Sequence, residues 1–161
     1  MAEFVLTRET VVERPLDEVF AFFSDAANLE RITPPALNFH IITPQPITIQ
    51  KGTLIDYELK MHGIPMNWRT EITEWDPPFE FIDTQLKGPY SQWIHRHRFS
   101  DLGDGRTKVE DEVRYRLPLE PLGDLFHFIV RGELEKVFDF RQQVIAEVFG
   151  NRAVYNSHSP E

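Results

Sequence analysis

Hydrophobic and polar residues alternate along most of the first two thirds of the chain. This period of two predicts β-strands, bounded by breaks rich in glycine and proline, over residues 3–13, 36–43, 53–62, 64–75, 79–86, 90–99 and 107–117. Two short helices are expected after the first strand. One begins at Pro15 and runs through VFAFF, and the other covers DAANLERI, which Pro34 and Pro35 end.

Toward the end of the chain the period becomes helical. Apolar residues from Leu122 to Phe149 return to one side, which predicts a helix of about 27 residues, roughly 40 Å long. Consecutive strands joined by short turns favour an antiparallel sheet, and such a sheet has one face that needs a cover. We therefore expect an α+β domain over residues 1–149, with six to seven strands and a long C-terminal helix. Residues 150–161 are expected to form a polar, disordered tail.

Composition and charge narrow the class of protein. The 161 residues suit one domain, and no apolar run approaches the roughly 20 residues that a bilayer span needs. The absence of cysteine excludes disulfides, thiolate metal ligands and a cysteine nucleophile. A net charge of −9 argues against nucleic acid as a partner, because that affinity depends on neutralising phosphates. The N-terminus lacks the features of a signal peptide, so we expect a soluble, cytoplasmic protein without stable membrane insertion.

The segment YSQWIHRHRF, residues 90–99, carries the most distinctive chemistry. Its alternation puts Trp93, His95 and His97 on one face of a strand and places Arg96 and Arg98 on the other. Because arginine side chains favour water, the two histidines are expected to point into the protein.

The turns on either side predict what the histidines face. A hairpin turning at Gly88-Pro89 puts Asp83 opposite His95, and a turn at residues 103–105 puts His97 opposite Asp111. Opposed side chains lie close enough to hydrogen-bond, so we expect the pairs Asp83–His95 and His97–Asp111. The rings expected around this network are Trp68, Phe81, Trp93 and Tyr115.

The order of elements and four segments resemble the SRPBCC superfamily, which includes START-type lipid carriers and polyketide cyclase/dehydrase-like proteins. The segments are VERPLDEVFAFFSDAANLERITPP, GPYSQWIHRHRF, DEVRYRLP and LEKVFDFRQQV, and the resemblance covers roughly residues 2–149. GPYSQWIHRHRF is similar to a bacterial ligand-binding subgroup of that superfamily. The resemblance implies a helix-grip fold, in which a curved antiparallel sheet wraps the long C-terminal helix and leaves a cavity for a hydrophobic small molecule. Many members only bind or carry the molecule, whereas others catalyse cyclisation, dehydration or hydrolysis, and no catalytic residue is universal.

The histidine cluster has three alternative roles. It can be structural, with buried histidines satisfied by carboxylates, or it can orient the polar end of an apolar ligand. It can also act chemically, as a His–Asp general base or as a set of ligands for a divalent metal. The candidate ligand-binding residues are Trp68, Asp83, Trp93, His95, His97, Asp111, Tyr115 and Arg141. Any catalytic group is expected among Asp83, His95, His97 and Asp111, and no metal or other cofactor is expected.

Binding or carrying of a hydrophobic small molecule is the favoured function. The alternatives are a cyclase, dehydratase or hydrolase in the same cavity, and a non-enzymatic protein-interaction module, which a filled interior would favour.

Arg141 either packs its stem and reaches water or enters the cavity to pair with an acidic ligand or Asp111. Access is expected through the 44–52 loop, the 87–89 turn and the start of the long helix. His62 and His127 are assigned no role, and Phe128 and Phe140 are candidates for a homodimer surface.

Overall fold

A computed structural model describes residues 2–119, 123–150 and 155–156 of the chain. Its strands are β1 (Phe4–Val12), β2 (His40–Ile41), β3 (Leu54–Met61), β4 (Ile64–Asp76), β5 (Glu80–Lys87), β6 (Gln92–Gly103), β7 (Arg106–Arg116) and β8 (Tyr155–Asn156). Its helices are α1 (Leu16–Phe23), α2 (Ala26–Arg31) and α3 (His127–Phe149), with 3₁₀ turns η1 (Pro35–Leu37) and η2 (Gly123–Phe126). The predicted α+β helix-grip fold is confirmed. No helix of the described part is long and apolar enough to cross a membrane.

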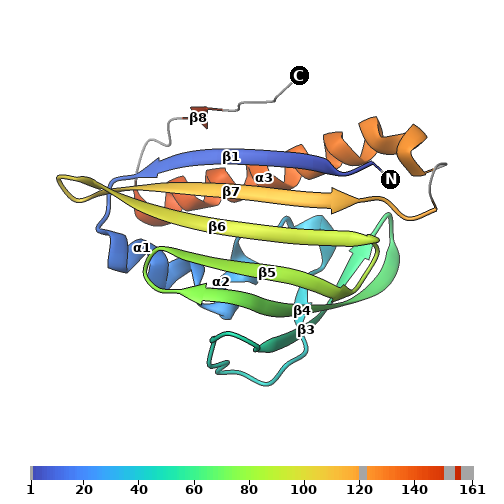
Figure 1. Cartoon of the computed structure of the whole chain (residues 1–161), viewed down its shortest axis with the longest axis horizontal. Coiled ribbons are helices and arrows are strands. Elements are labelled where there is room, and N and C mark those ends of the chain that lie inside the picture. The colour runs from blue at the N-terminus through green and yellow to red at the C-terminus, as the bar shows by residue number, and fades with distance from the viewer. Residues whose placement is uncertain (1, 120–122, 151–154, 157–161) are drawn as a thin grey trace.

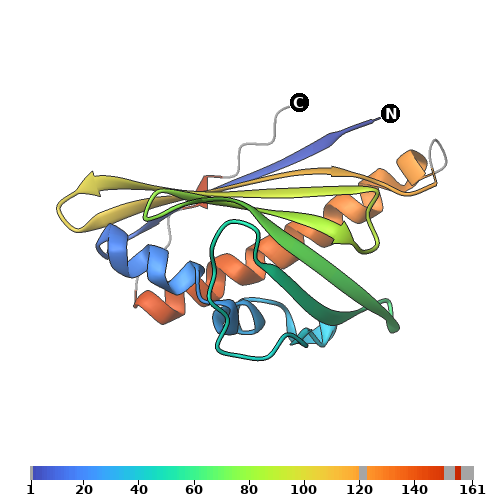
Figure 2. The same cartoon turned by 60° about the horizontal axis from the view of Figure 1, so that its bottom comes forward.

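The strands form one antiparallel sheet in the order β2-β3-β4-β5-β6-β7-β1-β8 (Figure 1). Figure 2 shows that α1, α2 and α3 lie on one side of this sheet, and that β3 and β4 turn toward α3 at one end. The pairing of β4 with β5 shifts register between Arg69 and Thr70 and again between Ile72 and Glu74. Such irregularities bend a strand and increase its twist, which lets this end of the sheet curve around the helix.

Two groups of buried residues hold the helices against the sheet. One group joins Phe20 of α1 and Ile145 and Phe149 of α3 to Phe81, Phe99 and other strand residues. The other group contains Leu134 and Phe138 of α3 and inward-facing residues of β3, β4, β6 and β7. The short helices begin where the sequence predicts, because Pro15 precedes α1 and the side chain of Asp25 accepts a hydrogen bond from the backbone N–H of Ala27.

Three expectations differ from the structure. The strand expected over 36–43 is wrong except at His40–Ile41, because Pro34 and Pro35 start a 3₁₀ turn and Asn38 adopts a left-handed conformation with φ 43°. The α-helix expected from Leu122, which lies outside the described residues, begins at His127 after a 3₁₀ turn. Leu125, Phe126 and Ile129 belong to the expected apolar face but are exposed.

The expected disordered tail, residues 150–161, falls mostly outside the described residues. Within it, Gly150 ends α3 in a left-handed conformation, and β8 pairs with Glu9 and Thr10 of β1. Of the two candidates for a dimer surface, Phe128 is exposed and Phe140 is partly buried, and the homodimer itself stays a prediction.

Candidate functional site

A cavity of about 230 Å³ lies between the sheet, α3 and the segment that contains α1, α2 and the following loop. The sheet contributes inward-facing residues of β3 to β6, including Ile55, Tyr57 and Leu59 of β3. The helix α3 contributes Leu134 and Phe138. Because β3 alternates strictly between buried and more exposed positions, the sequence period itself determines which of its side chains form the wall.

Aromatic rings make up much of the wall. Trp68 stacks on Tyr57 with ring centres 5.7 Å apart and meets the edge of Trp93 at 5.4 Å. Tyr90 packs on Trp93 at 4.8 Å. These contacts hold the rings in position, so the wall is a preformed apolar surface.

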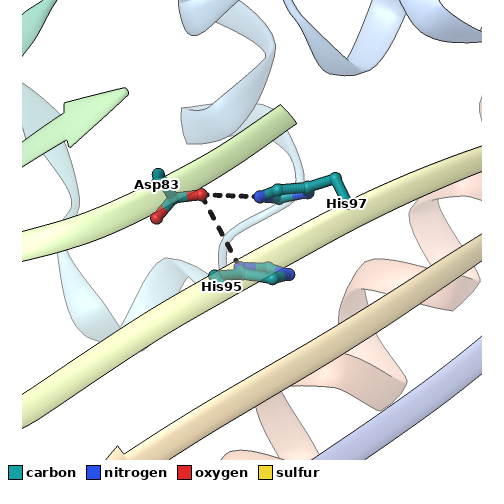
Figure 3. Close-up of side chains that lie close together, drawn as sticks. All are labelled: Asp83, His95 and His97. Atoms are coloured by element: carbon teal, nitrogen blue, oxygen red, sulfur yellow. Dashed lines mark hydrogen bonds and ion pairs between the residues drawn. The ribbon is translucent and has the colours of Figure 1, made fainter. Parts of the chain in front are cut away.

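A polar cluster of five side chains, Asp83, His95, His97, Asp111 and Arg141, lies at one part of this wall. Nε2 of His97 is 2.6 Å from Oδ2 of Asp83, and Nε2 of His95 is 2.8 Å from Oδ1 of Asp111. Figure 3 shows Asp83 on one strand facing both imidazoles of the next, with the longer distance, 3.9 Å, to Nδ1 of His95. All five residues are buried apart from Asp83, whose side chain is 17% exposed.

The predicted register is confirmed, whereas the predicted hydrogen-bond partners are exchanged. Asp83 is opposite His95 and His97 is opposite Asp111 on the backbone, as the turns predict. Each carboxylate nevertheless bonds the diagonal histidine, two residues along the neighbouring strand. Side chains lean along their strands and adjacent strands are twisted against each other, so a long side chain can reach the diagonal position.

Ring stacking fixes both imidazoles. His95 and His97, two residues apart on one face of β6, stack with centres 3.7 Å apart, and the other face of His97 lies on Phe81 at 4.1 Å. Neither ring can rotate freely between these neighbours. Their nitrogens are therefore held in fixed directions, toward Asp83 on one side and Asp111 on the other.

Arg141 supplies the positive charge of the cluster. Its Nη2 lies 3.2 Å from Oδ1 of Asp111 and 3.4 Å from Nδ1 of His97, and its guanidinium packs over the rings of Phe23 and Phe138. Of the two alternatives for Arg141, the one in which the guanidinium reaches water is wrong. Arg141 lies on the buried face of α3 with 7% of its surface exposed, and it pairs with Asp111.

The charges determine which nitrogens carry protons. Burial raises the pKa of Asp111, but the charge of Arg141 and the hydrogen bond from His95 outweigh it and hold the pKa well below its usual range. Burial also opposes ionisation of Asp83, whose pKa is nevertheless lowered by the hydrogen bond and charge of His97. Burial, with the charge of His95, lowers the pKa of His97 to about 4. An ionised carboxylate only accepts, so Nε2 donates in both histidines.

Two buried nitrogens of the cavity wall lack a hydrogen-bond partner among the described residues. Of the imidazole nitrogens, Nδ1 of His97 accepts from Arg141, and Nδ1 of His95 lies 3.9 Å from Oδ2 of Asp83. Trp68 Nε1–H and Arg141 Nε–H are buried donors that have no acceptor in the described part of the chain. Unpaired polar atoms cost free energy inside a protein, so their presence at a cavity wall points to a binding partner.

Six of the eight predicted site residues line the cavity, namely Trp68, Asp83, Trp93, His95, His97 and Arg141. Asp111 lies behind the histidines and holds them. Tyr115 is fully buried in the core beside Trp93, and its hydroxyl is 2.8 Å from Nε2 of His127. His127, to which the sequence assigned no role, stacks on Phe4 at 3.5 Å, and His62 is exposed and pairs with Glu133 at 3.0 Å.

Sequence reasoning missed much of the wall. Tyr57 and Leu59 alternate with polar residues in β3, and that signal could have identified them. The wall residues of α1, α2 and the loop give no such signal, because their position depends on how these segments pack against α3. They are Phe22, Phe23, Asp25, Ala26, Asn28, Leu29, Ile32, Thr33, Leu37, Phe39 and Ile49. Of the expected access elements, the loop contributes Ile49 to the wall, and the residue that follows the 87–89 turn, Tyr90, also lines it.

The model of the family described as "Polyketide cyclase / dehydrase and lipid transport" matches residues 12–140 of the chain. A search of curated proteins finds no match. The matched region contains every element from α1 to β7 and most of α3, and therefore every residue of the cavity wall except Arg141.

Solved structures share the fold at low sequence identity. The Zhui aromatase/cyclase from Streptomyces sp. R1128 has a TM-score of 0.74 and 14% identity, covering 92% of this chain and 94% of that chain. TTHA0849 from Thermus thermophilus has a TM-score of 0.71 and 16% identity, with coverages of 89% and 95%. A START superfamily protein from Mycobacterium smegmatis has a TM-score of 0.67 and 11% identity, with coverages of 89% and 98%. These similarities establish the fold and leave the chemistry to the residues of the site.

Proposed function

Because the chain belongs to the polyketide cyclase/dehydrase and lipid transport family of the SRPBCC superfamily, we propose that it binds a small, largely hydrophobic molecule in the cavity beneath α3. The observation that carries this proposal is the cavity itself, with aromatic walls and one polar cluster. Ligand sites in proteins typically combine an apolar concave surface with a few polar groups that set orientation. The cavity also gives no support to the protein-interaction module, which a filled interior would favour.

The cavity volume limits the size of the ligand. An engineered cavity of about 150 Å³ holds benzene, so 230 Å³ suits a molecule of about ten non-hydrogen atoms unless the walls move. A fused two-ring aromatic compound has this size, and it could stack on Trp68 or on Trp93, whose rings stand at 88° to each other. We expect a polar atom on its rim to accept a hydrogen bond from Trp68 Nε1 or Arg141 Nε.

A probe of this size tests the proposal. We expect 2-naphthol to bind the purified protein in isothermal titration calorimetry with one site per chain, and native mass spectrometry to detect any molecule retained from the expression host. The variant Leu59→Trp fills the cavity and should abolish binding, because Leu59 is 7% exposed and lines the wall. Leu54→Trp is the matched control, since Leu54 lies on the same strand and is 43% exposed. Equal binding of 2-naphthol by the two variants would contradict the proposal.

The position of His95 at the cavity wall favours one second candidate, an enzyme of the cyclase, dehydratase or hydrolase type. Asp111 holds the proton of His95 on Nε2, which leaves the Nδ1 lone pair free to act as a general base toward a bound substrate. Both nitrogens of His97 are engaged, by Asp83 and Arg141, so His97 is a positioning residue in this scheme. Once a substrate is known, His95→Gln should abolish turnover while retaining binding, and turnover by that variant would exclude the scheme.

A further inference from the structure

We propose that Asp83, His95 and His97 form a binding site for a divalent transition-metal ion, with Asp111 as the carboxylate that orients both imidazoles. The ligand atoms are the Asp83 carboxylate, His95 Nδ1 and His97 Nε2. This inference goes beyond the proposed function and does not depend on it, because the site can be tested with the metal ion alone.

The distances are close to those of a metal site. One ligand atom from each of the three residues lies within 4.8 Å of the other two, with Asp83 Oδ2 at 2.6 Å from His97 and 3.9 Å from His95. Metal–ligand bonds of about 2.0–2.2 Å put two ligands of a tetrahedral ion about 3.4 Å apart. The three atoms therefore need to move by about 1 Å or less to surround an ion. Figure 3 shows both imidazoles directed toward the same oxygen of Asp83.

The second carboxylate is placed as metal sites require. A metal-bound imidazole usually donates its other N–H to a carboxylate, which fixes the ring and its tautomer. His95 Nε2 already donates to Asp111 Oδ1 at 2.8 Å. His97 Nδ1 lies 3.5 Å from the same oxygen, so a change of tautomer, which gives up the hydrogen bond from Arg141, moves its proton to that side and frees Nε2 for the ion. Arg141 in turn holds Asp111 at 3.2 Å.

The charge of the cluster favours a cation. The cluster contains two carboxylates, Asp83 and Asp111, and one guanidinium, Arg141, so at ordinary ionisation with neutral imidazoles it carries one net negative charge in a buried region. An uncompensated buried negative charge is unfavourable. A bound divalent ion would make the net charge of the cluster positive and would use the lone pairs of both imidazoles.

The ligand set and the cavity select the class of ion. Two histidines and one carboxylate without thiolates suit Zn²⁺, Co²⁺ or Fe²⁺, and three protein ligands leave coordination positions open. All three residues line the cavity, so those positions would face it. His95 Nδ1 cannot be both a metal ligand and a free base, so metal binding also tests the second candidate function.

Titration of the full-length protein with Co²⁺ tests the site through the visible d–d absorption of the bound ion. The protein is first treated with a chelator and dialysed, and Zn²⁺ competition gives the relative affinities. We expect one ion per chain in the wild type and in His62→Gln, because His62 is an exposed histidine outside the cavity. Asp111→Asn should weaken binding by about 10–100-fold, and Asp83→Asn by more, because it removes a direct ligand.

Circular dichroism establishes that each variant is folded, and His95→Gln provides a second direct-ligand variant if Asp83→Asn does not fold. Loss of the Co²⁺ absorption in a folded direct-ligand variant, with retention in His62→Gln, is the expected result. Unchanged Co²⁺ binding in a folded direct-ligand variant would overturn the assignment. So would the absence of Co²⁺ binding by the wild type at about 1 mM Co²⁺, because a dissociation constant of about 1 mM corresponds to a binding free energy of only about 4 kcal/mol. Loss of 2-naphthol binding in Leu59→Trp with normal Co²⁺ binding would separate the two sites experimentally.

Discussion

Substitution of Arg141 by methionine removes the only guanidinium in contact with the polar cluster among the described residues. Methionine keeps most of the buried stem, so the change acts mainly on charge. In the native protein Arg141 Nη2 lies 3.2 Å from Asp111 Oδ1, and both side chains are less than a tenth exposed. The variant leaves the carboxylates of Asp83 and Asp111 together in the interior without a compensating cation.

The expected cost is large. Removal of one partner from a buried ion pair typically costs about 3–5 kcal/mol, because the other charge remains desolvated. A domain is stable by about 5–15 kcal/mol, so Arg141→Met should lose a substantial share of its stability at pH 7. For a chain of this length that loss corresponds to a fall in melting temperature of about 6–20 °C.

The pH dependence identifies the mechanism. Burial tends to raise the pKa of Asp111, and in the wild type the charge of Arg141 overcomes this and holds the pKa below that of the unfolded chain. The wild type therefore keeps this stabilisation above about pH 4 and loses it as the pH falls further. Without Arg141 the pKa of Asp111 rises, so the variant neutralises the carboxylate at a higher pH. The difference in free energy of unfolding between wild type and variant should shrink from pH 7 to pH 4.

Urea denaturation of chelator-treated protein at both pH values measures these quantities. Arg141→Met/Asp111→Asn, which removes both charges, should recover about 1–3 kcal/mol relative to the sum of the single variants. The matched control is Arg69→Met, because Arg69 bonds Asp56 at 2.8 Å on a half-exposed part of the sheet, where little change is expected. The ion-pair argument would be refuted if Arg141→Met lost no more free energy of unfolding than Arg69→Met. It would also be refuted if the loss in Arg141→Met were the same at pH 4 and pH 7.

Three further predictions concern stability, all measured by urea denaturation. Burial lowers the pKa of His97 from 6.5 to about 4, so only the unfolded chain takes up a proton between these values. The free energy of unfolding should therefore fall by about 3 kcal/mol from pH 7 to pH 4, and His97→Gln should lack that slope. Phe20→Ala should cost about 3–5 kcal/mol, because Phe20 is 6% exposed between Phe81 and Phe99, whereas Phe79→Ala at a 54% exposed site should cost under about 0.5 kcal/mol. Asp25→Ala, which removes the N-cap of α2, should lower the free energy of unfolding by about 1 kcal/mol. An unchanged free energy of unfolding would show that the cap does not stabilise the protein.

Local pattern was sufficient for most of the sheet. Alternation in β3 and β4 predicts that Ile55, Tyr57 and Trp68 face inward, and the structure confirms it. The turns at 88–89 and 103–105 predict the register of β5, β6 and β7, which places Asp83 opposite His95 and His97 opposite Asp111. These predictions hold because a strand has a side-chain period of two and a tight turn determines the pairing of the residues beside it.

The same local pattern could not predict the hydrogen bonds within the cluster or the walls of the cavity. Whether Asp83 bonds His95 or His97 depends on strand twist and side-chain direction, which pairing alone leaves open. The insertion of Arg141 between Asp111 and His97 depends on the rotation of α3 over the sheet. The walls from α1, α2 and the loop depend on where these segments pack.

The sequence by itself therefore determined most of the elements, their order, the register of the histidine strand and the inward direction of its imidazoles. Only the tertiary structure decided which carboxylate holds each imidazole, that Arg141 balances them, and that an unfilled volume remains beside them. The physical reason is the range of the interactions. Period and turn geometry act between residues close in sequence, whereas the cavity and its charges result from the packing of α3, about 30 to 45 residues further along the chain, against the twisted sheet.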